Sequence, residues 1–169
     1  MGYERSLAEI VGTDEARRWW ERGVTQRELP PIASGAESPR ERIERLIREG
    51  KMTREAVDRA EYLWYERWQR GIQMPNGEVV SISLDDLYHL LVDNRIWRKP
   101  ERIERILHGV YELRATREGR RRALSRWDEE GQSLVGYAII SGDSHAWTMH
   151  IIAERDLRKY RDEELLWSQ

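Results

Sequence analysis

The chain has 169 residues and carries 29 Lys and Arg side chains against 31 Asp and Glu side chains, which gives a formal net charge of −2. This balance excludes a basic surface over the whole protein of the kind that coats nucleic acid, and no apolar run approaches the ~18 residues that cross a membrane. Eight Trp and seven Tyr argue against a disordered chain, and the absence of Cys excludes disulfides and thiol chemistry. With no N-terminal hydrophobic segment typical of a signal peptide, we expect a cytoplasmic protein without membrane contact.

Residues 1–71 are expected to form a helical N-terminal region. Thr13 fits the N-cap of a first helix that ends at Gly23, and this helix carries Trp19 and Trp20 side by side. Adjacent residues of a helix cannot both face one narrow core. We therefore expect one of these two Trp side chains to be exposed or to bind a protein partner.

Two further helices are expected in this region, after a proline-containing linker at residues 25–39. Ser38 and Glu41 have the spacing of a capping box, which starts the first of them. The second is longer and covers residues 53–70, with apolar side chains along one side.

From residue 72 the pattern changes to that of a mixed domain. The turn sequence Pro75-Asn76-Gly77 precedes a short strand at residues 78–83. Another capping box opens a helix at Ser83, and a second helix starts at Pro100.

Four strands separated by glycine-containing turns follow, at residues 110–116, 121–128, 134–141 and 145–153. A final amphipathic helix is expected over residues 156–167. The pattern predicts an α+β fold, in which an N-terminal helical region (1–71) is followed by a domain at 72–169. In that domain a helix pair packs on a four-stranded antiparallel sheet, with a C-terminal helix.

Alternation along the strands predicts which side chains share a face of this sheet, because successive residues of a strand point to opposite sides. Facing the helices we expect Trp127, Trp147 and Met149. On the opposite face we expect Arg122, Arg126, Thr148 and His150. Tyr137 fits either face.

The second group fits the chemistry of RNA cleavage without a metal ion. That reaction needs a base for the 2′-hydroxyl, cations for the phosphate and an acid for the leaving oxygen. His150 is a candidate for base or acid, and Arg122 and Arg126 are candidates for a bidentate phosphate clamp. Tyr137 or His145 would supply a second proton or a stacking surface. In the alternative interpretation, His150 is a cross-strand packing partner.

The hairpin at residues 114–126 concentrates arginine, and we expect it to form a local RNA-binding patch. Besides Arg122 and Arg126, the patch contains Arg114, Arg117, Arg120 and Arg121. The alternative is a solvated turn whose guanidiniums pair with neighbouring acids such as Asp128, Glu129 and Glu130.

Residues 79–160 resemble the barnase–EndoU–colicin–RelE (BECR) group of small metal-independent RNases. The resemblance depends on the order of the elements and on four short segments: Lys99-Pro100-Glu101-Arg102-Ile103, Val110-Tyr111-Glu112-Leu113, Gly119-Arg120-Arg121-Arg122-Ala123-Leu124 and Met149-His150-Ile151-Ile152. In RelE-like toxins a comparable glycine-then-arginine strand and the final strand carry the catalytic groups. The resemblance therefore implies catalytic roles for Arg122, Arg126 and His150.

Two functional hypotheses follow. In the first, the protein is an RNA endonuclease, a toxin or phage-related effector that cleaves through 2′-hydroxyl attack and needs neither cofactor nor metal ion. In the second, it is a non-catalytic adaptor subunit of a larger protein or nucleoprotein assembly. Its partner would then bind the Trp-rich helices, namely Trp19-Trp20, Trp64-Tyr65 and Trp68, because aromatic side chains dominate interface hot spots.

Overall fold

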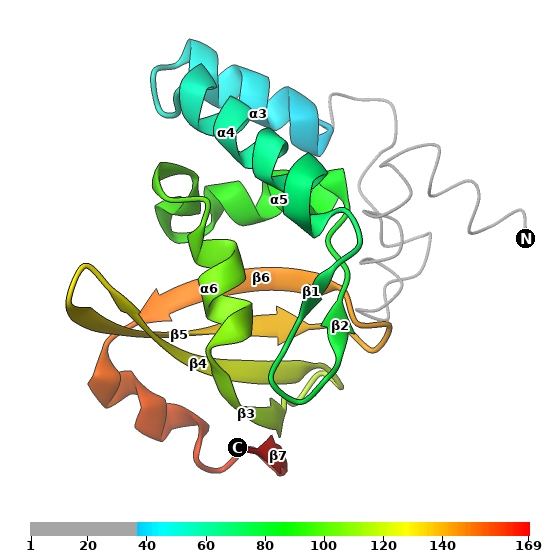
Figure 1. The fold of residues 1–169 in the computed structure, drawn as a ribbon, viewed down its shortest axis with the longest axis vertical. Helices are drawn as coiled ribbons and strands as arrows, with labels where there is room; N and C mark the ends of the chain where they lie inside the picture. The colour runs from blue at the N-terminus through cyan, green and yellow to red at the C-terminus, as the bar shows by residue number, and fades with distance from the viewer. Residues whose placement is uncertain (1–36) are drawn as a thin grey trace, which may run out of the picture.

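The computed structural model describes residues 37–169 (Figure 1). The elements before the main sheet are α3 (Pro39–Arg48), α4 (Arg54–Leu63), the π-helical turn η2 (Trp64–Trp68), β1 (Ile72–Gln73), β2 (Val79–Val80), α5 (Leu84–Val92), the 3-10 segment η3 (Asp93–Arg98) and α6 (Arg102–His108). They are followed by β3 (Val110–Ala115), β4 (Arg121–Glu129), β5 (Gln132–Ile140), β6 (Ala146–Ile152), the 3-10 segment η4 (Glu154–Tyr160) and β7 (Leu165–Ser168). Within this part of the chain, no helix has the length and apolar character to span a bilayer.

Local capping chemistry sets the starts of two helices. The Ser38 hydroxyl accepts a hydrogen bond from the backbone of Glu41 at 3.1 Å, and the Glu41 carboxylate accepts one from the Ser38 backbone in return. Ser83 and Asp86 repeat this exchange at the start of α5. Each exchange satisfies backbone donors that the first turn of a helix would otherwise leave unpaired.

Five antiparallel strands form the main sheet in the order β6-β5-β4-β3-β7. In Figure 1, α6 crosses one face of the sheet, and α5 lies beside β6. One continuous hydrophobic core joins these helices to the sheet through Leu91, Ile106 and Met149, none of which is exposed. Trp68 of η2 is also fully buried in this core, so residues 37–71 pack directly on the α+β part. The expected α+β class, with an antiparallel sheet, is confirmed.

The prediction of a C-terminal helix over residues 156–167 is wrong, and the sheet has five strands where four were expected. The segment forms η4 and then β7, in which Trp167 pairs with Leu113 of β3. The backbone N–H of Ala115 donates to Glu164 and that of Gln169 to Tyr111, both at 2.9 Å. An edge strand offers unpaired backbone groups that a local helical pattern does not reveal, and β7 satisfies those of β3.

Trp147 lies on the side of the sheet opposite to the prediction. Ile139 pairs with Thr148, whereas the next residue, Ile140, pairs with Ala146, so Trp147 is the extra residue of a β-bulge in β6. Trp147 is buried, but it lines the same cavity as Arg122 and Tyr137, and its ring centroid lies 4.7 Å from the guanidinium carbon of Arg120. The expectation that Trp147 faces the helices is therefore wrong, because simple alternation fails at a bulge.

Candidate active site on the open face of the sheet

The face of the sheet turned away from α5 and α6, here called the open face, collects the side chains that the alternation placed together. Arg122, Ile139 and Thr148 form one row of directly paired residues across β4, β5 and β6. Two residues further along these strands, Tyr137 and His150 form part of the next row. Directly paired residues of antiparallel strands share a face. Tyr137, which fitted either side, therefore lies on the open face.

His150 is held through both of its ring nitrogens. Thr148 Oγ1 donates to Asp93 Oδ2 at 2.6 Å, so its oxygen can accept the Nε2 proton of His150 at 3.1 Å. The other ring nitrogen, Nδ1, lies 2.8 Å from the side-chain amide nitrogen of Asn94 and accepts its hydrogen bond. This arrangement assigns the proton to Nε2 and leaves the basic lone pair on Nδ1.

Asp93 and Asn94 reach β6 because η3 contains an unusual kink. Asn94 and Arg95 adopt consecutive left-handed conformations, with φ of 46° and 55°. Such a conformation costs a non-glycine residue about 1 kcal/mol or more, and such residues cluster at functional sites. Arg95 is exposed and makes no ion pair with any residue of the described range. An Asp-Asn pair at a helix end is the only local signal of this contribution, and it was not predicted.

Arg122 lies between two tyrosine rings on the open face. Its guanidinium carbon is 4.5 Å from the ring centroid of Tyr137 and 4.0 Å from that of Tyr160 in η4. Its Nε and Nη2 donate to the two carboxylate oxygens of Glu163 at 2.8 and 3.1 Å. Burial, followed by a hydrogen bond with Tyr160, raises the pKa of Tyr137 to about 12. Tyr137 is therefore a neutral phenol near neutral pH, able to donate a proton in a hydrogen bond.

Arg126 forms a similar bidentate ion pair with a second carboxylate. Its Nη1 and Nη2 donate to the two oxygens of Glu154, each at 2.7 Å, at the surface of the protein. Glu154 and Glu163 both belong to residues 154–168, here called the C-terminal segment. This segment therefore places a carboxylate on each arginine that was predicted to clamp a phosphate.

The other arginines of the predicted RNA-binding patch also form ion pairs, except Arg117. Arg114 donates to Glu112 and to two backbone carbonyls of the C-terminal segment. Arg120 pairs with Glu118, and Arg121 with Glu78. Arg117 is exposed and has no ion pair within residues 37–169. The patch is thus an ion-paired surface, although its partners are not the acids at 128–130.

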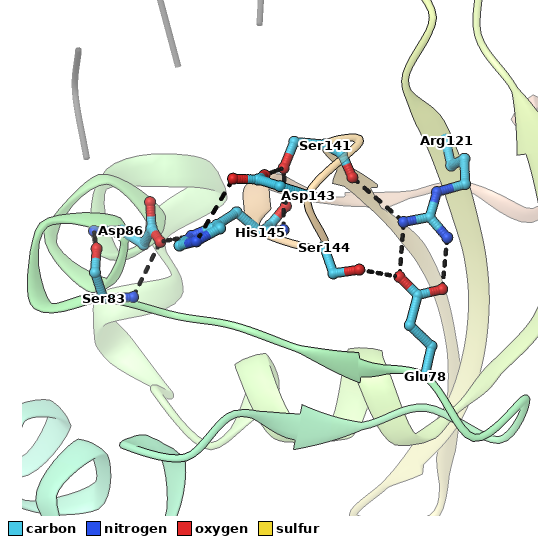
Figure 2. A network of polar contacts seen from close by, with 8 residues as sticks. All are labelled: Glu78, Ser83, Asp86, Arg121, Ser141, Asp143, Ser144 and His145. Carbon is cyan, nitrogen blue, oxygen red and sulfur yellow. Dashed lines mark hydrogen bonds and ion pairs between the residues drawn. The ribbon is translucent and has the colours of Figure 1, made fainter. Parts of the chain in front are cut away.

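Figure 2 shows that Arg121 and His145 belong to a network at the other end of β6. His145 Nδ1 lies 2.9 Å from the buried carboxylate of Asp86, at the start of α5. Arg121 donates to Glu78 at 2.7 Å, and the Ser144 hydroxyl donates to the same carboxylate at 2.6 Å. These contacts join α5, β4, the residue before β2 and the β5–β6 turn. The structure does not bring His145 together with His150 and Arg122.

The Glu78–Arg121 pair gives a prediction for stability in acid. Hydrogen bonding to Arg121 lowers the pKa of Glu78 below its ordinary 4.5, so the folded state favours the carboxylate. The pair therefore stabilises the protein above about pH 4.5, and this contribution is lost as the pH falls through the folded-state pKa. Glu78→Gln should remove about 0.5–1 kcal/mol at pH 7 and flatten the acid dependence. Urea unfolding between pH 3 and 7 measures the free energy of unfolding of both proteins at each pH. Glu66→Gln, at an exposed position, is the control, and parallel pH curves for wild type and Glu78→Gln would contradict the prediction.

A cavity of about 800 Å³ lies between the open face and the C-terminal segment. The sheet and the β3–β4 turn contribute Ala115, Thr116, Arg117, Glu118, Arg120, Arg122, Tyr137, Ile139, Trp147 and Thr148. The C-terminal segment contributes Lys159, Tyr160, Asp162, Glu163 and Glu164. The cavity thus adjoins the row that carries His150, and its walls combine aromatic rings with guanidiniums.

The aromatic residues proposed for partner binding divide into three groups. Trp19 and Trp20 lie outside the described residues. Trp68 is fully buried, and the indole N–H of Trp64 donates to the Ile82 carbonyl at 2.7 Å. Tyr65 is 60% exposed.

Comparisons of the chain with models of protein families, with curated proteins and with solved structures find no match.

Proposed function

We propose that the protein is a metal-independent RNA endonuclease, a toxin or phage-related effector, whose active site lies on the open face. The observation that carries this proposal is the chain of hydrogen bonds from Asp93 through Thr148 to His150. A base oriented by a second polar group is typical of acid–base catalysis. In addition, His150 shares its face with two arginines in bidentate pairs with carboxylates, a geometry that also suits phosphate. The resemblance of residues 79–160 to the BECR RNases agrees with this assignment.

The proposed reaction begins when a ribose 2′-hydroxyl takes the place of the Asn94 amide at His150. Nδ1 of His150 accepts the hydroxyl proton while the 2′-oxygen attacks the adjacent phosphorus. The bond from phosphorus to the 5′-oxygen breaks, and that oxygen takes the phenol proton of Tyr137, which water restores afterwards. The products are a 2′,3′-cyclic phosphate and a free 5′-hydroxyl. Arg122 and Arg126 stabilise the charge on the phosphate oxygens once these replace the carboxylates of Glu163 and Glu154.

The chemistry of the RNA ends tests this proposal directly. The full-length protein is incubated with end-labelled single-stranded RNA in excess EDTA, and the products are separated at nucleotide resolution. We expect 2′,3′-cyclic phosphate ends, together with complete resistance of any position that carries a 2′-deoxy or 2′-O-methyl ribose. Cleavage at a 2′-deoxy position, or no cleavage of any RNA, would refute the proposed reaction.

The adaptor role is the second candidate, favoured by one observation. Tyr62 and Tyr65 on α4 and η2 are 58% and 60% exposed, and large aromatic side chains are frequent interface anchors. Substituting both with serine should weaken binding of a protein partner while the fold is retained. An unchanged set of co-purified proteins would count against a docking role for this face.

A further inference from the structure

The cavity beside His150 has the features of a site for one nucleotide. Ligand pockets of about 300–1,000 Å³ accept small molecules, and this one measures about 800 Å³. Tyr137, Trp147 and Tyr160 present aromatic rings at its walls, and bases stack on such rings without regard to sequence.

Arg120 supplies a second, independent indication of a ligand. Its side chain lines the cavity although only 8% of it is exposed, and it lies over the ring of Trp147. Nη1 pairs with Glu118, but the buried Nε has no hydrogen-bond partner among the residues of the described range. A buried donor without a partner is uncommon in folded proteins. Nε itself is closed off from the cavity, so an acceptor atom of a bound base would satisfy it once the Arg120 side chain turns toward the cavity.

The charges around the cavity indicate which kind of phosphate fits. Four cations (Arg117, Arg120, Arg122 and Lys159) face four acids (Glu118, Asp162, Glu163 and Glu164), so the walls are neutral in sum. A phosphodiester carries one negative charge and two free oxygens, as the Glu163 carboxylate does on Arg122. It can therefore accept the same two hydrogen bonds from Arg122 that Glu163 accepts.

We propose that this cavity binds one nucleotide unit of single-stranded RNA, with its phosphodiester on Arg122 in place of Glu163 and its base against Tyr160 and Arg120. This inference builds on the proposed endonuclease and adds a substrate subsite to it. It also gives the C-terminal segment a role as an internal competitor, because Glu163 must leave Arg122 before the phosphodiester can bind.

Binding of an RNA dinucleotide that cannot be cleaved tests the subsite without depending on catalysis. The probe is adenylyl-adenosine with a 2′-O-methyl group, titrated against the full-length protein by calorimetry. Tyr160→Leu should weaken binding about tenfold, whereas Tyr160→Phe should preserve it, because base–ring stacking accounts for roughly this factor. Glu163→Gln should strengthen binding about fivefold, because the amide competes less well for Arg122. Glu66→Gln, at an exposed position of η2, is the matched control for Glu163→Gln.

The possible results distinguish failure of the proposed subsite from failure of the proposed endonuclease activity. If the dinucleotide binds with this pattern while RNA stays intact, the subsite stands and the proposed cleavage is wrong. If RNA is cleaved but neither Tyr160→Leu nor Glu163→Gln changes the dissociation constant, the subsite is wrong and the endonuclease stands. Absence of dinucleotide binding to both wild type and Glu163→Gln would also overturn the subsite.

Discussion

Replacing His150 by alanine should lower the rate of RNA cleavage by about 100-fold or more, the usual effect of losing a general base. The side chain carries the only imidazole of the open face within residues 37–169, and Asp93 and Thr148 fix which of its nitrogens is basic. Single-turnover cleavage of labelled RNA in EDTA measures the effect. Urea unfolding of the same variant shows whether the fold is retained.

Two further variants test whether the loss of cleavage is specific to His150 and to its link with Asp93. His108→Ala removes an exposed imidazole at the end of α6 and should leave the cleavage rate unchanged. Thr148→Val breaks the link to Asp93 but keeps the side-chain shape, and we expect an intermediate loss of about tenfold. If His150→Ala cleaves at the wild-type rate, His150 is a packing residue and the assignment fails.

Several parts of the fold could be predicted because they depend on short-range chemistry. The capping boxes at Ser38 and Ser83 each involve a partner only three residues away. The shared face of Arg122 and His150 follows from the two-residue period of strands, which holds along β4 and up to the bulge in β6. The prediction failed at Trp147 because a bulge adds one residue to a strand without any signal in the alternation.

The partners of the site residues could not be predicted because they are distant in sequence. Glu163 is 41 residues from Arg122, and Glu154 is 28 residues from Arg126. Their positions depend on β7 adding to the edge of β3, while the apolar spacing of the same segment suits a helix. The two arginines could therefore be identified from the sequence. The carboxylates that form ion pairs with them could be identified only from the three-dimensional arrangement of the strands.

Gly136→Ala should destabilise the protein by about 3 kcal/mol, at the upper end of what overpacking costs. Gly136 lies in β5, where it pairs with Ile151 of β6. A Cβ atom there would lie 2.3 Å from the backbone oxygen of His150 and 3.2 Å from Trp127. A side chain could rotate away from such a clash, but a strand carbonyl cannot, so β5 and β6 would have to separate.

This separation would occur where β6 carries His150, so the same variant tests both the fold and the site. Gly142→Ala is the matched control, because a Cβ atom at Gly142 meets nothing within 4 Å and its φ is not left-handed. We expect Gly142→Ala to change the free energy of unfolding by less than about 0.5 kcal/mol. Urea unfolding of both variants gives the comparison. If Gly136→Ala is as stable as Gly142→Ala, the close approach of β5 to β6 is wrong, and with it the pairing that sets Tyr137 beside His150.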